Sequence, residues 1–361
     1  TLVEKDTRLG GTCLLRGCIP SKALLHVGRV VAEVREMQDW GVHFSAPKID
    51  IDAVRSRKEK VIGDLTGGLA QLAKRRNVQI VQGQAIFTAS NAIEVIQKDS
   101  GSQTLTFEHC ILASGSRPAR IPAFDIGSSR VMDSTAALQL EDVPDSLLVI
   151  GGGYIGLEMG TVYAELGSRV SVVELTDGLL PGADRDLVKP LHQRLKGLFE
   201  AIRLNTKVVG LKESGNGVEV SFEGPDGETT ETFSRVLVAV GRRPNSDGMG
   251  LENTNVVVDS KGFVEVDKQQ RTGDSHILAI GDVCGEPMLA HRASHQGEVA
   301  VESLHGEPAM FDPRAIPAVV FTDPEIAWAG LTEQEAELSG REIEISRYPW
   351  AASGRAPALG D

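Results

Sequence analysis

Residues 147–156 read Leu-Leu-Val-Ile-Gly-Gly-Gly-Tyr-Ile-Gly, an apolar run that leads into a glycine-rich turn and an apolar, helix-like segment. This order predicts a buried strand, a tight turn and a helix whose N-terminus can hold a dinucleotide pyrophosphate. Gly151 suits the turn, Gly153 lets the backbone approach the phosphates, and Gly156 lets the helix pack closely on the strand. The alternative is a glycine-rich turn in an unrelated α/β domain, which the flanking strand and helix disfavour.

A second apolar run ends in Glu174, about 20 residues after the glycines, where such folds place an acid on the adenosine ribose. A carboxylate there would accept hydrogen bonds from the ribose hydroxyls and repel a 2′-phosphate. Residues 175–177 contain no arginine to receive that phosphate, so we expect NAD rather than NADP. The predicted NAD site comprises Gly151, Gly153, Tyr154, Ile155, Gly156, Glu158, Glu174, Val208 and Gly241.

Around this unit, short β-branched runs alternate with longer helical ones, which predicts an α/β fold with parallel sheets. Strands are expected at Leu147–Ile150, Val170–Glu174, Val218–Phe222, Val236–Val240 and Ile277–Ile280. Helices are expected at Ala23–Met37, Ile51–Arg75, Tyr154–Leu166, Asp186–Phe199 and Ala293–Leu304. Two strands end in similar small-residue turns, at residues 113–116 and 239–242, so we expect two Rossmann-like nucleotide-binding domains.

Composition excludes several classes of function. The 361 residues carry 37 basic against 50 acidic side chains, a net charge of -13, which argues against nucleic acid as a partner. No apolar run approaches the roughly 20 residues that span a bilayer, so no membrane role is expected. The four cysteines are too few for a disulfide scaffold, and no zinc-type cluster completes the C-x4-C pair, so we expect no metal site.

That cysteine pair, Cys13 and Cys18, lies in a segment built to bend. Residues five apart in an ideal helix point roughly 140° away from each other, so a disulfide would require a distortion, which Gly17 permits. Pro20 is tolerated in a first helical turn, which places Cys18 near a helix N-terminus. The dipole there favours a thiolate by up to about 2 kcal/mol and brings Cys18 toward a neutral pKa. Two buried structural thiols are the alternative.

The segment 10–22 resembles the redox-disulfide segment of the flavin-dependent pyridine nucleotide–disulfide oxidoreductases, most closely of dihydrolipoamide dehydrogenases. The resemblance implies that Cys18 faces the flavin as the charge-transfer thiolate and that Cys13 exchanges with the dithiol substrate. It also implies that Lys22 lies near the flavin and that Glu158 is its partner. The catalytic residues are therefore predicted to be Cys13, Cys18, Lys22 and Glu158.

Other segments resemble the same family along the whole chain. Residues 1–5 resemble the end of the second strand of an FAD-binding unit, residues 114–116 a family turn with Ser for Thr, and residues 279–282 the second FAD motif. The FAD site is predicted at Glu4, Gly10, Gly11, Thr12, Cys13, Lys22, Ala85, Ser114, Gly115, Ser116, Asp282, Met288, Leu289, Ala290 and His291. The predicted domains are 1–120 (FAD), 121–243 (NAD), 244–313 (FAD, second part) and 314–361 (start of an α+β dimerisation domain).

The resemblance implies oxidation of dihydrolipoamide through Cys13–Cys18 and FAD to NAD, in a bacterial cytoplasm. The implied partners are a second subunit and the lipoyl domains of 2-oxoacid dehydrogenase complexes. The family's FAD glycine pattern is expected before residue 1. None of the eight histidines precedes a proline as the family's base does, so residues 1–361 alone are expected to be inactive. Glutathione reductase, mercuric reductase and a non-catalytic nucleotide-binding subunit remain alternatives.

Overall fold

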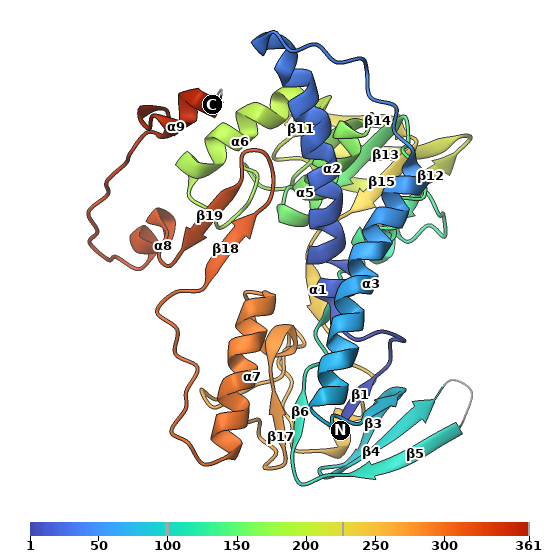
Figure 1. The fold of residues 1–361 in the computed structure, drawn as a ribbon, viewed down its shortest axis with the longest axis vertical. Coiled ribbons are helices and arrows are strands. Elements are labelled where there is room, and N and C mark those ends of the chain that lie inside the picture. Colours follow the sequence, from blue (N-terminus) through green and yellow to red (C-terminus); the bar gives the residue numbers. More distant parts are fainter. Residues whose placement is uncertain (98–100, 226, 360–361) are drawn as a thin grey trace.

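A computed structural model describes residues 1–97, 101–225 and 227–359 of the chain (Figure 1). Helices and strands alternate between residues 131 and 203, as the sequence pattern predicts, whereas residues 80–118 and 201–279 form mainly successive strands. The helices are α1 (Gly11–Arg16), α2 (Cys18–Glu36), α3 (Ile51–Arg75), α4 (Ser134–Ala137), α5 (Tyr154–Glu165), α6 (Arg185–Leu198), α7 (Ala290–Leu304), α8 (Glu333–Leu338) and α9 (Arg355–Leu359).

A five-stranded parallel sheet forms the centre of the first nucleotide-binding half. Its order is β11 (Ala201–Arg203), β10 (Arg169–Val173), β9 (Ser146–Ile150), β15 (Arg235–Val238) and β8 (Val131–Met132). All five residues of β9 are buried, because both faces of the sheet are covered. The apolar run that precedes the glycines is therefore the middle strand of a sheet, as the sequence predicts.

Residues of β9 alternate between two hydrophobic cores. Leu147 and Val149 pack on the side of α5 and α6, in a cluster that also contains Leu24 of α2. Leu148 and Ile150 pack on the opposite side, against a three-stranded antiparallel sheet. That sheet consists of β12 (Lys207–Ser214), β13 (Gly217–Gly224) and β14 (Gly227–Phe233). Period-two alternation thus serves both faces, so every position of the strand after Ser146 is apolar.

The other half contains two separate pairs of parallel strands. One pair is β1 (Leu2–Glu4) with β2 (Ile80–Gln82), and the second is β6 (Cys110–Leu112) with β17 (Ile277–Ala279). An antiparallel sheet of β3 (Gln84–Ala89), β4 (Ala92–Gln97) and β5 (Gly101–Thr106) packs beside them. Val81, Leu112 and Ile277 share one core, so the two pairs belong to one half of the molecule although no ladder joins them.

Two long helices connect the halves (Figure 1). The α3 helix has the predicted bounds, with the Asp50 side chain accepting a hydrogen bond from Ala53 N–H at its start. By contrast, α2 starts at Cys18, five residues before the predicted start, because the helical conformation is interrupted only at Gly17 and resumes at the next residue. Near the end of α2, Arg35 is paired with the buried carboxylate of Glu165 in α5. The two halves also meet where β7 (Ser116–Pro118) pairs with β16 (Arg242–Pro244).

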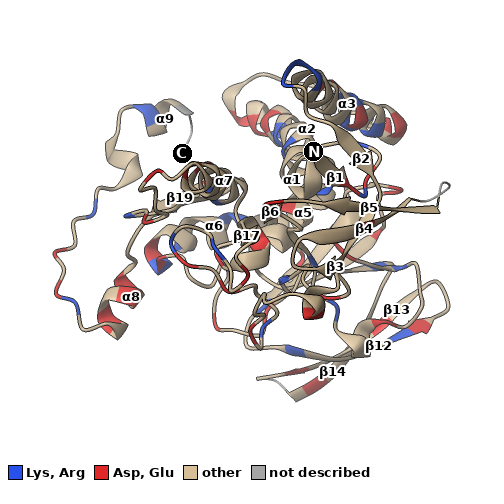
Figure 2. Cartoon of the chain, turned by 90° about the horizontal axis from the view of Figure 1, so that it is seen from below, with Lys and Arg blue, Asp and Glu red and all other residues tan. Residues whose placement is uncertain are grey.

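The C-terminal segment begins with the hairpin of β18 (Pro317–Val320) and β19 (Ile326–Ala329) and continues through α8 (Figure 1). Val320 and Ile326 are buried in the core on the helix side of the central sheet, so the hairpin is docked on the first half. The α8 helix is acidic, whereas α3 carries both signs of charge (Figure 2). Among the described residues, no helix is both long and apolar enough to cross a membrane.

Candidate active site

The predicted glycine turn joins β9 to α5 as expected. Gly151 has φ +110°, and a Cβ there would lie 2.4 Å from Ala239 O, so only glycine fits this turn. A Cβ on Gly156 would lie 2.2 Å from Gly151 O, which explains the close packing of helix and strand. A Cβ on Gly153 would meet nothing within 4 Å, and no side chain caps α5. The start of α5 is therefore uncapped and has open space beside Gly153, which fits a pyrophosphate.

Glu174 directly follows β10 and lies beside this turn. Its carboxylate accepts hydrogen bonds from Gly152 N–H at 2.7 Å and from Thr176 N–H and Oγ1–H at 2.8 Å each. An ionised carboxylate offers about four acceptor positions. One position is therefore left for a ribose hydroxyl. Glu174 also fixes the shape of the glycine turn, a role that the sequence pattern did not reveal.

The cysteine pair lies at the junction of α1 and α2. Cys13 belongs to α1, and Cys18 is the first residue of α2, as Pro20 in the first turn predicts. Gly17 has φ -149° and ψ -114° and breaks the helix between them. Both thiols are free. Cys18 is exposed. The hydrogen bond from Cys13 and the charge of Lys22 lower the pKa of Cys18 to about 7, against partial desolvation of the thiolate. The same bond and burial raise the pKa of Cys13, so Cys18 is the thiolate of the pair.

Lys22 and Glu158 form the ion pair that the resemblance implies, between α2 and α5. Lys22 Nζ lies 2.9 Å from each carboxylate oxygen of Glu158. Ser21 Oγ–H donates to Glu158 Oε2 at 2.7 Å, and Phe321 N–H donates to Oε1 at 3.1 Å. The carboxylate is 4% exposed and has several donors, so its charge is compensated within the protein. Sequence reasoning missed Ser21 and Phe321, although Ser21 stands directly beside Lys22.

On the other half, Ser116 of β7 meets Asp282, which lies in a short 3-10 helix (Gly281–Cys284) after β17. Ser116 Oγ–H donates to Asp282 Oδ2 at 2.5 Å, and Arg242 Nε–H donates to Ser116 Oγ at 2.8 Å. Asp282 Oδ1 has no hydrogen bond within the described part of the chain, so it can accept one from a ribityl hydroxyl. Arg242 is a site residue that the sequence did not single out, because its partner Ser116 is distant in the chain.

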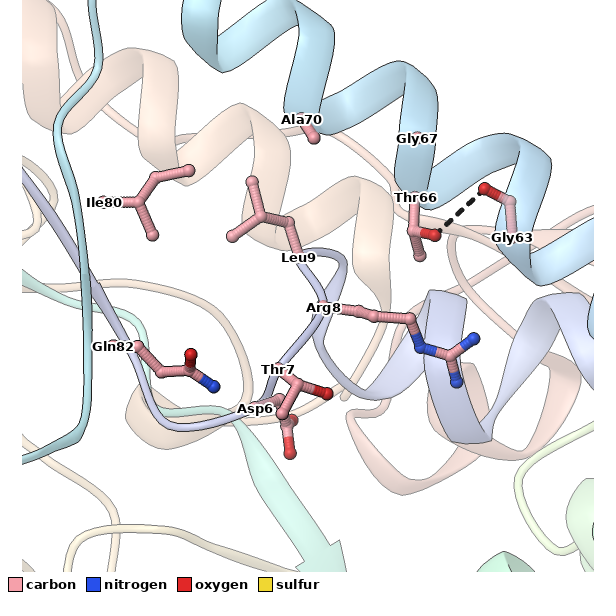
Figure 3. A pocket seen from close by; sticks show the side chains of 10 residues that line it. All are labelled: Asp6, Thr7, Arg8, Leu9, Gly63, Thr66, Gly67, Ala70, Ile80 and Gln82. Carbon is pink, nitrogen blue, oxygen red and sulfur yellow. Dashed lines mark hydrogen bonds between the residues drawn. The ribbon is translucent and has the colours of Figure 1, made fainter. Parts of the chain in front are cut away.

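A cavity of about 320 Å³ lies between residues 6–9, α3 and β2 (Figure 3). The lining residues 6–9 lie in the sequence between Glu4 and Gly10, which both belong to the predicted FAD site. Leu9 and Ile80 line it with apolar surface, and Asp6, Thr7 and Arg8 line it with polar groups (Figure 3). A mixed lining of this kind suits a nucleotide, which has an apolar base and polar phosphates. The cavity suits the nucleotide part of FAD, and the free oxygen of Asp282 suits its ribityl chain.

Several predicted site residues do not present their side chains to either cofactor region. Val208 is buried in the core beneath the central sheet, and Ala85 packs against the core of the other half. Only the backbone of these two can contact a ligand. The Nε2 atom of His291 bonds with Pro317 O at 2.9 Å, which ties α7 to the C-terminal hairpin.

The remaining cysteines, Cys110 and Cys284, pack against the core of the other half. Burial raises the pKa of Cys110 to about 11 and also raises that of Cys284. Within residues 1–97, 101–225 and 227–359, no group of three or more His, Cys, Asp or Glu is arranged to hold a metal.

Two family models match the chain. The pyridine nucleotide-disulphide oxidoreductase model matches residues 1–297, and the model of that family's dimerisation domain matches residues 316–361. Curated relatives are similar along nearly the whole chain. A dihydrolipoyl dehydrogenase of Vibrio cholerae is 48% identical over 358 residues, which cover 99% of this chain and 75% of that protein. One of Bacillus subtilis is 44% identical over 363 residues, which cover 100% of this chain and 76% of that protein.

Solved structures show the same fold. LpdA of Mycobacterium tuberculosis superposes with a TM-score of 0.90 at 26% identity, over 99% of this chain and 78% of that one. The HOCl-induced flavoprotein disulfide reductase RclA of Escherichia coli superposes with a TM-score of 0.86 at 28% identity, over 100% of this chain and 78% of that one. Sequence and fold therefore agree with the geometry of the site.

Proposed function

Because the chain belongs to the pyridine nucleotide-disulphide oxidoreductase family, we propose that it oxidises dihydrolipoamide to lipoamide at Cys13 and Cys18 and passes the electrons through FAD to NAD. Members of this family use both cofactors. One observation carries the proposal. Cys18, with a pKa of about 7, is the first residue of α2, and Lys22 in the next turn of that helix pairs with the buried Glu158 of α5.

The chemistry at the cysteine pair is a two-step exchange. A substrate thiolate attacks the Cys13 sulfur of the Cys13–Cys18 disulfide, and Cys18 leaves as a thiolate. The second substrate thiol then displaces Cys13. The substrate loses two electrons and two protons as its disulfide forms, and the cysteine pair gains them.

The residues around the pair give the two sulfurs different chemical roles. Cys18 is the better leaving group because its pKa is lowered, whereas Cys13 keeps its proton and donates a hydrogen bond to Cys18. Lys22 stabilises the Cys18 thiolate by its charge, and Glu158 holds Lys22 in place. A bound flavin would supply the route by which the electron pair leaves as hydride toward the nicotinamide.

Each cofactor has a proposed set of partners on the chain. FAD would extend from Glu4, past residues 10–12 and the turn at 114–116, to Asp282. NAD would lie with its pyrophosphate on the start of α5 and its ribose at Glu174. Residues 1–120 and 244–313 would form the FAD domain, 121–243 the NAD domain, and 314–361 part of the dimerisation domain.

The dimerisation domain indicates that the protein acts as a homodimer. We further infer that its substrate is carried on lipoyl domains of 2-oxoacid dehydrogenase complexes. Support comes from the relatives, which are named dihydrolipoyl dehydrogenases. The bacterial sources of several of them support a bacterial cytoplasm as its location.

A spectroscopic titration tests the proposal. Adding one equivalent of dihydrolipoamide to the flavin-loaded protein should produce a long-wavelength charge-transfer band that Cys18→Ser lacks. NADH-linked rates with lipoamide, oxidised glutathione and Hg(II) should then favour lipoamide. A band that survives in Cys18→Ser, or a preference for glutathione or Hg(II), would contradict the assignment.

A further inference from the structure

Phe321 lies against the Lys22–Glu158 pair but belongs to the C-terminal hairpin, far from both in sequence. Its ring faces Lys22, with Nζ 4.3 Å from the ring centroid. Its backbone N–H donates to Glu158 Oε1 at 3.1 Å. One residue therefore contacts the cation through its ring and the anion through its backbone.

The hairpin holds Phe321 firmly in this position. Val320 is 1% exposed and Ile326 is 4% exposed, both in the core on the helix side of the central sheet. Thr322, 3% exposed, donates its hydroxyl hydrogen bond to Pro324 O at 2.9 Å. Asp323 is paired with Arg194 of α6 at 3.0 Å. These contacts fix the backbone on both sides of Phe321, which is itself 37% exposed.

The charged and titratable groups around Cys18 come from three elements. They are Cys13 of α1, Lys22 of α2, and Tyr154 and Glu158 of α5. Lys22 is the one cation among the groups that act on Cys18. A long lysine side chain has many rotamers, so its ammonium stays beside Cys18 only where contacts hold it.

We propose that Phe321 is a positioning residue for the redox pair: its ring and its N–H hold Lys22 and Glu158 so that the ammonium stays beside Cys18. The docked C-terminal hairpin thereby keeps the positive charge of Lys22 close to Cys18. This inference rests on the proposed function, since it assigns a role to Phe321 through the cysteine that the function uses.

The test is a pH titration of thiolate absorbance near 240 nm in the reduced, flavin-loaded protein, with Cys18→Ser subtracted. Wild type should show a Cys18-dependent step near pH 7. Phe321→Leu removes the ring face and should move that step up by about half a pH unit, the size of one cation–π contact. Phe321→Met should move it in the same direction. Phe321→Tyr keeps an aromatic face and should leave it in place.

Phe311→Leu is the matched control, because the Phe311 ring faces Arg292 and His295 rather than Lys22. It should leave the step unchanged. An unshifted step in folded Phe321→Leu or Phe321→Met, or an equal shift in Phe321→Tyr, would overturn the role of Phe321. Absence of any Cys18-dependent step in wild type would instead overturn the proposed function itself.

Discussion

The two nucleotide-binding halves are built differently. In the NAD half, one continuous five-stranded sheet and one turn supply Gly151, Gly153 and Glu174 within 24 residues of sequence. In the flavin half, Glu4, Ser116 and Asp282 come from segments that no common ladder joins. A site held by one sheet is specified locally, whereas the second site depends on distant segments meeting. The redox cysteine lies between them, at the contact of α2 with α5.

Cys18→Ser is expected to have the largest effect, and it tests whether thiol chemistry and NADH binding can be separated. In the full-length protein, removing the thiolate should lower dihydrolipoamide oxidation by roughly 10³-fold or more, because a serine cannot form the disulfide. The affinity for NADH, measured by fluorescence quenching, should stay within about threefold of wild type, since the glycine turn is untouched. A large loss of NADH affinity would show that the halves are coupled more tightly than the structure indicates.

A pair of glycine substitutions separates folding from binding in the NAD half. Gly151→Ala places a Cβ 2.4 Å from Ala239 O at φ +110°, so the free energy of unfolding should fall by about 3 kcal/mol. Gly153→Ala meets no protein atom within 4 Å, so its melting temperature should remain near that of wild type. Its Kd for NADH should nevertheless rise by about 10-fold or more, because the new methyl group occupies the approach to the phosphates. Unchanged NADH binding in Gly153→Ala would contradict the pyrophosphate assignment.

Glu158→Gln tests the contact between the halves. The negative charge of Glu158 raises the pKa of Cys18, so its removal should lower that pKa below about 7. The thiolate should then persist to lower pH, which iodoacetamide reaction at pH 5–8 would detect at Cys18. The NH2 group of the new amide would also point toward the donors of Ser21 and Lys22. The free energy of unfolding should therefore fall by about 1–3 kcal/mol. A pKa that rises would mean that loss of Lys22 positioning outweighs the lost negative charge.

Glu174→Gln should have the smallest effect. The amide oxygen can still accept from Gly152 N–H or from Thr176 N–H, though not from both, and the charge that repels a 2′-phosphate is gone. The ratio of NADH to NADPH affinity should fall by about tenfold, mainly through tighter NADPH binding. Asp177→Asn, which removes a nearby exposed charge outside the turn, is the matched control and should change the ratio less. Equal effects of the two variants would argue against a specific role of Glu174.

The sequence predicted much of the site in the NAD half. Residues 147–174 form strand, turn, helix and strand close to the predicted bounds, because each step is specified by neighbouring residues: an apolar run, glycines, and a periodic helix. The bend at Gly17 and the place of Cys18 near a helix N-terminus were predicted for the same reason, although the helix starts five residues before its predicted bound. The Lys22–Glu158 pair came from family resemblance, and the structure shows it directly.

The sequence by itself thus determined the local units: the glycine turn, the cysteine bend and the acid that ends the second strand. Only the tertiary structure decided which distant groups complete them. Phe321 meets Glu158 across 163 residues, and Arg242 meets Ser116 across 126. No periodicity or spacing encodes such contacts, since a backbone N–H has no sequence preference and a guanidinium can serve many partners. They exist because buried polar groups must be satisfied once packing has brought these segments together.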